Sequence, residues 1–149
     1  MVKRVFLFLT ILAATQIFIS IAYSKMEKGG SPSTVTLSSS EVVCDLNGEW
    51  TALYEYYGPY LRRGSYKDTL KVIQKDNKFV GIKLISSEGV GKDVGNIRGE
   101  LDRNGIKKAQ VMTDDGFWAT CRGEMFLSKD CNKMVLDDNR VIKVTLERK

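Results

Sequence analysis

The chain contains no histidine among its 149 residues, and it has only two prolines and three cysteines. The absence of histidine excludes catalytic triads that use imidazole, metal sites with imidazole ligands, and imidazole acid–base chemistry. The cysteines, Cys44, Cys121 and Cys131, form no C-x-x-C pair, so neither a redox motif nor a zinc knuckle is expected. We expect no cofactor and no metal.

Long apolar runs are also scarce. Residues 5–24 form one, and they directly follow Lys3 and Arg4. A charged start, an apolar stretch and small residues at its end are typical of a signal peptide, so we expect residues 1–24 to be removed on export. The alternative is that the stretch is kept as a membrane anchor, because it is long enough to span a bilayer. The expected localisation is secreted or periplasmic, with membrane contact only through an uncleaved signal segment.

The excess of positive charge is small. Removal of residues 1–24 takes away two basic residues and no acid, which lowers the formal net charge from +5 to +3. This charge is too weak to indicate a nucleic-acid-binding protein, so no nucleic-acid partner is expected.

Paired carboxylates are the only candidates for catalysis. They occur as Asp114-Asp115 and Asp137-Asp138. Adjacent side chains in a strand point to opposite faces, and aspartate is common in turns, so both pairs fit hairpin turns better than an active site. We predict that the protein is not an enzyme.

Residues 25–41 are small and polar, with a Gly-Gly and a proline. Such a segment cannot bury enough apolar surface to order itself, so we predict a flexible leader. The domain is then expected to cover residues 42–149.

This domain is predicted to be all-β. Apolar and polar residues alternate in short runs separated by turn residues, among them the hairpin signal Asn104-Gly105, and no run has a helical period. The expected strands are 44–57, 68–74, 78–85, 95–101, 106–113, 117–127, 132–136 and 140–148. Short connections make them an antiparallel meander, and closure would remove its exposed edges. The predicted fold is a single small up-and-down barrel of about eight strands.

Alternation within the strands predicts which side chains share the apolar inner face. Those of the first strand are Trp50, Ala52, Tyr54 and Tyr56. Later strands contribute Val80, Ile82 and Leu84, then Ile97, Gly99 and Leu101, and finally Ile142, Val144 and Leu146.

The first strand also carries a family resemblance. Gly48-Glu49-Trp50 resembles the G-x-W motif that opens the first strand of lipocalin-like (calycin) barrels, and residues 44–51 (C-D-L-N-G-E-W-T) resemble an avidin opening. The resemblance implies that Trp50 lies at the closed end of the barrel and is covered by an arginine of the last strand, here Arg148. It therefore implies structural roles for Gly48, Trp50 and Arg148, with a cation–π contact between the last two.

The chain departs from both branches. It lacks the longer loops and the C-terminal helix of lipocalins, and it lacks a recognisable set of biotin contacts. Biotin binding is therefore not expected.

Export implies that two of the three cysteines pair, and three pairings are possible. In the implied barrel, Cys131 lies in a turn at the closed end near Cys44, whereas Cys121 lies in mid-strand. We predict a Cys44–Cys131 disulfide and a buried free thiol at Cys121. An avidin-like alignment would instead send Cys44 toward the strand of Cys121.

The opposite end is predicted to be the mouth, where loops 58–67, 86–94 and 114–116 gather. The side chains expected to line or rim it are Tyr56, Tyr57, Tyr60, Arg62, Arg63, Tyr66, Ser86, Ser87 and Trp118. Aromatic walls suit a small ligand, and the arginines suit an anionic head group or an acidic protein surface. The alternative is that the tyrosines only pack in the barrel and the arginines are solvated.

The predicted ligand-binding residues are Tyr56, Tyr57, Tyr60, Arg62, Arg63 and Trp118. The expected function is that of an exported, non-enzymatic protein that holds a small hydrophobic or amphipathic ligand at the open end. The alternative is a barrel with a filled interior that binds another protein through its loops, as small G-x-W barrel protease inhibitors do. The partner is accordingly a small molecule or a protein, and the interior volume distinguishes the two.

Overall fold

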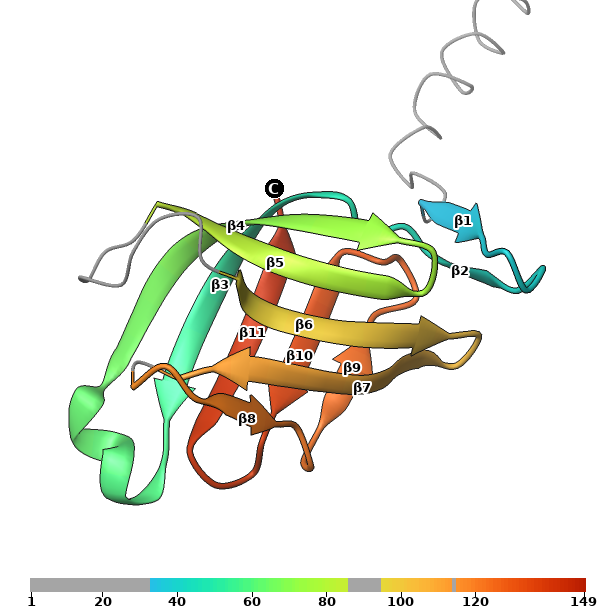
Figure 1. Ribbon diagram of the computed structural model, residues 1–149. Coiled ribbons are helices and arrows are strands. Elements are labelled where there is room, and N and C mark those ends of the chain that lie inside the picture. Colours follow the sequence, from blue (N-terminus) through green and yellow to red (C-terminus); the bar gives the residue numbers. More distant parts are fainter. Residues whose placement is uncertain (1–32, 86–94, 114) are drawn as a thin grey trace, which may run out of the picture. The chain divides into compact units, whose positions relative to one another are not determined.

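The computed structural model describes residues 33–85, 95–113 and 115–149. The predicted signal peptide and the first part of the predicted leader therefore lie outside the described residues, as does the loop 86–94. The described part is all-β except for one short 3-10 helix, η1 (Gly58–Arg63) (Figure 1). In these ranges no helix is long and apolar enough to cross a membrane.

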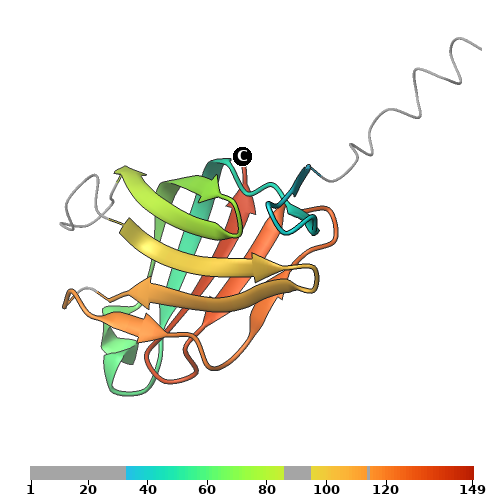
Figure 2. The ribbon, with the colours of Figure 1, turned by 45° about the vertical axis from the view of Figure 1, so that its right-hand side comes forward.

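Nine strands form one antiparallel sheet in the order β8-β7-β6-β5-β4-β3-β11-β10-β9. Their bounds are β3 Gly48–Tyr56, β4 Ser65–Lys75, β5 Lys78–Ile85, β6 Gly95–Asp102, β7 Gly105–Met112, β8 Trp118–Thr120, β9 Met125–Leu127, β10 Lys133–Asp137 and β11 Ile142–Arg148. The sheet curls strongly around a single core, as the two views in Figures 1 and 2 show. Strand β3 lies between β4 and β11, so the strand with the Gly-x-Trp motif is central to the sheet.

The predicted strand 117–127 is divided into β8 and β9, which lie at opposite edges of the sheet. The residues between them contact both edges. The amide of Cys121 donates to the carbonyl of Ala109 in β7 at 2.9 Å, and the carbonyl of Glu124 accepts from the amide of Asp137 in β10 at 2.9 Å. A Cβ atom on Gly123 would come within 3.0 Å of Asn139, which explains a glycine at this corner.

The inner face of β3 is as predicted, because Trp50, Ala52, Tyr54 and Tyr56 are all buried. The intervening side chains, from Thr51 to Glu55, are only half-buried. In β11 the predicted inner side chains are also buried, namely Ile142, Val144 and Leu146. Alternation thus correctly predicts the orientation of the two central strands.

The prediction for β5 is wrong. Its buried side chains are those of Phe79 and Lys83, with Gly81 between them. The predicted inner residues of this strand are half-buried on the other face, namely Val80, Ile82 and Leu84. A Cβ atom on Gly81 would lie 2.5 Å from the Ile97 side chain, so only glycine fits this inner position. The pairing of β5 with each neighbouring strand also shifts register. The apolar alternation of β5 therefore does not show which of its faces points inward.

Two short strands precede the sheet and pair with each other, β1 (Thr34–Thr36) and β2 (Val42–Cys44). The sequence predicts residues 33–41 as part of a flexible leader, but here they are fixed to the sheet. Leu37 is buried in the core. The amide and hydroxyl of Ser38 donate to the carboxylate of Asp76, in the β4–β5 turn, at 2.8 and 3.0 Å.

Candidate functional site at the open end of the sheet

Trp50 and Arg148 organise the end of the sheet at which β3 begins, which the resemblance implies is the closed end; we call it the closed end and the opposite end the open end. Trp50 is fully buried, and its indole nitrogen donates to the carbonyl of Leu46 at 3.0 Å. The guanidinium carbon of Arg148 lies 4.8 Å from the centre of the indole ring, so the predicted cation–π contact is present. Gly48 lies directly beside it, since a Cβ atom there would be 3.4 Å from the Arg148 Nη1 atom.

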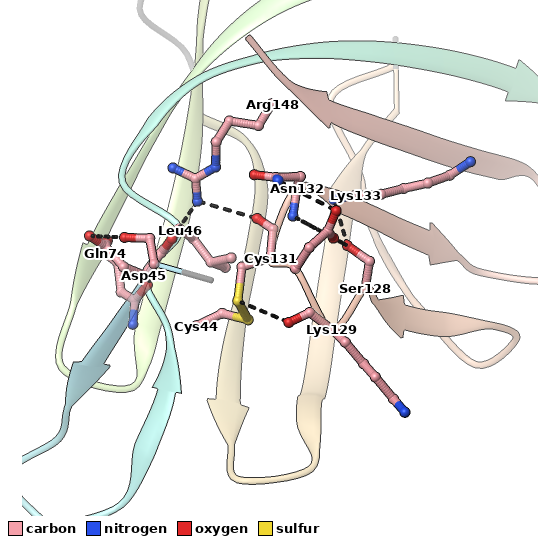
Figure 3. Close-up of a disulfide and its surroundings, with 12 residues drawn as sticks. Cys44, Asp45, Leu46, Gln74, Ser128, Lys129, Cys131, Asn132, Lys133 and Arg148 are labelled. Carbon is pink, nitrogen blue, oxygen red and sulfur yellow. Dashed lines mark hydrogen bonds between the residues drawn. A yellow bond between two sulfur atoms is a disulfide. The ribbon is translucent and has the colours of Figure 1, made fainter. Parts of the chain in front are cut away.

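Hydrogen bonds from Arg148 also link the loop between β2 and β3 to the turn between β9 and β10 (Figure 3). Its Nη1 atom donates to the carbonyl of Asn47 at 2.8 Å, and its Nη2 atom donates to the carbonyls of Asp45 and, at 3.3 Å, Cys131. The first two carbonyls belong to the β2–β3 connection and the third to the β9–β10 turn. This side chain therefore fixes the end of the sheet at which β3 begins.

The predicted disulfide joins the same two connections. Cys44 and Cys131 are bonded, with 5.6 Å between their Cα atoms, so the avidin-like alternative with Cys121 is wrong. Cys121 is free and buried, as predicted. Burial, with the nearby charges of Asp138 and Asp137, raises the pKa of its thiol to about 12, so the thiol is a poor nucleophile at neutral pH. The disulfide is a weak indication of an extracellular or oxidising compartment.

At the opposite end, an ion pair joins two of the three predicted mouth loops. Arg63 at the end of η1 contacts both carboxylate oxygens of Asp115, in the β7–β8 turn, at 3.1 and 3.2 Å. The guanidinium carbon of Arg63 also lies 5.1 Å from the ring centre of Tyr60 and 5.6 Å from that of Tyr56. Both arginines are exposed to solvent, but the Arg63 side chain is held in place by Asp115 and by the two tyrosine rings. The third loop, with Ser86 and Ser87, is outside the described residues.

A cavity of about 260 Å³ lies between η1, the β7–β8 turn and the start of β11. The residues that line it are Tyr60, Thr113, Asp115, Phe117, Trp118, Ala119 and Val141. Its walls are mainly apolar, and Asp115 contributes the charged group. Two of the predicted ligand-binding residues, Tyr60 and Trp118, thus line one cavity, and Arg63 reaches its rim through Asp115.

Tyr57 makes its described contacts elsewhere, and Trp118 has a second contact besides its place in the cavity wall. The Tyr57 hydroxyl donates to the Asp137 carboxylate at 3.2 Å, and burial together with this negative charge raises the pKa of Tyr57 to about 12. The indole of Trp118 lies under Arg98, whose guanidinium carbon is 4.1 Å from the ring centre. Arg98 in turn donates to Gln110 at 2.8 Å, so part of Trp118 covers the outer face of β6 and β7.

A buried polar layer lies next to the mouth tyrosines, and the sequence analysis did not identify it. The ammonium of Lys83 lies 2.6 Å from the carboxylate of Asp68, and both side chains are 0% exposed. The ammonium is also 5.7 Å from the ring centre of Tyr54 and 5.2 Å from that of Tyr66, which stack on each other at 4.6 Å. Burial and the Asp68 charge raise the pKa of Tyr54 well above its usual value. The sequence does contain one indication of this layer. Asp68 is two residues before Leu70 in β4, so both side chains point to the same face of the strand.

The paired carboxylates do not converge on a common point. Asp138 accepts hydrogen bonds from the amides of Arg140, Val141 and Ile142 at 2.8 to 2.9 Å, which is the geometry of a turn. Asp115 pairs with Arg63, and Asp114 is outside the described residues.

Two further hollows occur on the surface. One of about 420 Å³ lies over β5 to β8, beside Arg98, Gly99 and Gln110. The other, of about 260 Å³, lies beside the disulfide and the β6–β7 turn. In the described ranges, no group of three or more histidine, cysteine or acidic residues is placed to hold a metal ion.

No protein-family model, curated protein or solved structure matches the chain. Its function must therefore be inferred from the chemistry and position of these sites.

Proposed function

We propose that this is an exported, non-enzymatic, lipocalin-like protein that holds a small amphipathic ligand at the open end of a β-barrel. Closure of the curled sheet into a barrel is supported by the corner at residues 121–124. Its backbone pairs with Ala109 of β7 and with Asp137 of β10, so the bent strand β8–β9 bridges the two edges. Export is supported by the disulfide and by the apolar N-terminal sequence.

The observation that carries the proposal is the cavity between η1 and the β7–β8 turn. Its aromatic and aliphatic walls suit an apolar group, and Asp115 with its Arg63 partner places a charged pair at the rim. Ligand pockets for drug-sized molecules are about 300–1,000 Å³, so a cavity of about 260 Å³ suits a smaller molecule. The apolar part of the ligand would contact Tyr60 and Val141, and its polar part would face Arg63 and Asp115.

The walls of the cavity are also held before any ligand binds. Arg63 is fixed by Asp115 and by two tyrosine rings, and Tyr56 packs on Tyr66, whose ring centre is 6.2 Å away. A binding site whose side chains are already ordered loses less conformational entropy on binding. The entropy cost of binding a ligand here is therefore reduced.

Native mass spectrometry of the protein purified from its own host tests the proposal. We expect an adduct of one small molecule on the wild-type chain. In Val141→Phe the larger side chain fills the cavity, and the adduct should be lost. Thr120→Phe is the matched control, because it makes a comparable enlargement in the hollow over β6 and β7 and should keep the adduct. A wild-type chain without adduct, or an adduct lost only in Thr120→Phe, would refute the proposal.

Binding of another protein is the second candidate, and one observation favours it. The half of the barrel near the closed end is filled, because Trp50, Leu70 and Leu146 are fully buried. A filled interior is what a barrel that acts through its loops would have. A bare chain in the mass spectrum, together with a protein that co-purifies with wild type but not with a Leu61→Ser variant in η1, would support this candidate instead.

A further inference from the structure

The two most exposed large hydrophobic side chains among the described residues are both at the open end. Phe117 is 72% exposed and Leu61 is 68% exposed. We propose that this end docks on the surface of a bilayer that contains anionic lipids, with Leu61 and Phe117 inserted between the head groups. We call these two side chains the apolar tip. Docking itself does not depend on the proposed ligand-binding function.

The apolar tip is one feature rather than two isolated side chains. Leu61 belongs to η1 and Phe117 to the β7–β8 turn, and the Arg63–Asp115 ion pair joins these two segments. Phe117 also lines the same cavity as Tyr60, the neighbour of Leu61 in the chain. The two exposed side chains therefore flank a single opening. Such a grouping at one end of a molecule indicates an interaction site, whereas scattered exposed residues do not.

Aromatic side chains adjoin the apolar tip. Tyr60 and Trp118 are half-buried, and each directly adjoins a member of the tip in the sequence. Tyrosine and tryptophan combine an apolar ring with one polar group, and they concentrate at the level of lipid head groups. Half-buried rings next to exposed apolar side chains suit interfacial anchoring.

Two exposed arginines lie near the same opening. Arg62 directly follows Leu61 and is exposed. Arg140 is also exposed, and its carbonyl oxygen would lie 3.6 Å from a Cβ atom on Gly58, so the β10–β11 turn adjoins the start of η1. Neither arginine forms a salt bridge within the ranges that the structure describes. Basic side chains at a membrane surface are attracted by anionic lipids, which gives the charge complementarity that the proposal requires.

The arrangement favours a bilayer over a protein partner. The apolar tip is formed by two short segments, η1 and the β7–β8 turn, and aromatic and arginine side chains adjoin it in the sequence. This combination of apolar, aromatic and basic side chains is typical of a membrane interface. Docking by this end would turn the cavity toward the bilayer, so that an amphipathic ligand could exchange with the lipid phase.

Tryptophan fluorescence can test this docking, because the two tryptophans lie at opposite ends. Trp50 is fully buried at the closed end, while Trp118 is half-buried beside Phe117. Vesicles of phosphatidylcholine and phosphatidylglycerol with brominated acyl chains should quench Trp118, and the quenching should be absent in Trp118→Phe. Phosphatidylcholine alone should quench less, and added salt should weaken the effect. The readout is local, so it is valid whether or not residues 1–24 remain on the exported chain.

Removal of the apolar tip gives the decisive comparison. In Leu61→Ser with Phe117→Ser, half-maximal quenching should need at least about tenfold more lipid, because two apolar side chains no longer enter the interface. Val42→Ser is the matched control, since Val42 is 57% exposed but belongs to β2 beside the disulfide. An equal loss in the control, unchanged quenching in the double variant, or no quenching by anionic vesicles would overturn the proposal. The last result would favour a protein partner at the apolar tip.

Discussion

Arg148 stabilises the closed end by more than its contact with the Trp50 ring. One planar guanidinium group serves three backbone carbonyls, those of Asp45, Asn47 and Cys131, and still covers the indole. A lysine could retain the charge, but it could not make this set of contacts. Its donors all lie on one nitrogen atom, whereas those of arginine are spread over a planar group. The last strand and the connection before β3 are thus held together by a group that only arginine provides.

Substitution of Arg148 should therefore be costly. We expect Arg148→Lys to lower the free energy of unfolding by about 1–2 kcal/mol and Arg148→Ala by about 2–4 kcal/mol, because partly buried carbonyls lose their donors. Urea unfolding followed by fluorescence would measure both. Arg103→Lys, in the exposed β6–β7 turn, is the control and should have no effect. Unchanged stability in Arg148→Ala would show that the contacts at this end are not important.

The buried Lys83–Asp68 pair leads to a second prediction. Lys83→Met should destabilise the protein by about 3–5 kcal/mol, because the Asp68 carboxylate keeps its buried position and loses its cation. Lys71→Met, on the exposed face of β4, makes the same change in side chain and should have little effect.

A double-mutant cycle identifies the cause. When Asp68→Leu is added to Lys83→Met, the total loss should be smaller than the sum of the single losses by about 1–3 kcal/mol. Strictly additive losses would mean that the two charges do not interact in the folded protein.

The residues of the closed end could be predicted from the sequence, whereas the buried Lys83–Asp68 ion pair could not. Gly48, Trp50 and Arg148 follow from one short motif and its position relative to the last strand. The burial of Lys83 depends on a register shift in β5 and on a partner in β4, and neither leaves a trace in the local alternation. The alternating apolar residues of β5 are Val80, Ile82 and Leu84, so alternation alone predicts the wrong inner face.

Among the elements, the β1–β2 hairpin has an anchor that depends on pH. The amide and hydroxyl of Ser38 donate to the Asp76 carboxylate and lower the pKa of Asp76 below its ordinary value of 3.8. A carboxyl group whose pKa is lower in the folded state contributes stability that is complete above its unfolded pKa. This contribution is lost as the pH falls through the lowered folded value.

Ser38→Ala should weaken the anchor, because it removes the hydroxyl donor and leaves only the backbone amide of residue 38 to donate to Asp76. We expect the variant to melt at a lower temperature than wild type at neutral pH, and the two melting temperatures should converge when the pH is lowered well below 3.8. Thermal unfolding across this range would measure the difference. Ser39→Ala is the control, because Ser39 does not contact Asp76 in the described structure. A difference that stays constant in acid would exclude the Asp76 carboxylate as the cause.

The elements also show where local sequence is informative. Alternation and turn residues predicted eight strands, and the hairpin at Asn104-Gly105 is present between β6 and β7. The division of 117–127 at Gly123 was missed, because it depends on where Asn139 and the β10–β11 turn lie. The ordering of residues 33–41 was missed because it is held by the distant Asp76 and by burial of Leu37.

At the scale of the whole molecule, the two ends of the sheet differ in chemistry. One end is locked by a disulfide and by Arg148. The other brings together loops that carry aromatic and charged side chains around a cavity. Which loops gather at which end was predictable from a meander that starts at a Gly-x-Trp motif. The cavity lining was only partly predictable, because Ala119 and Val141 reach it through the curl of the sheet.

Amide hydrogen exchange would test most directly whether the open end is the ligand-binding end. The exported protein would be compared as purified with its small molecule and after that molecule has been removed. We predict that the bound molecule slows exchange in residues 58–64 and 115–118 and leaves the amides around Trp50 unchanged. Slowing confined to the hollow around Arg98 and Gln110, or no slowing anywhere, would contradict this prediction.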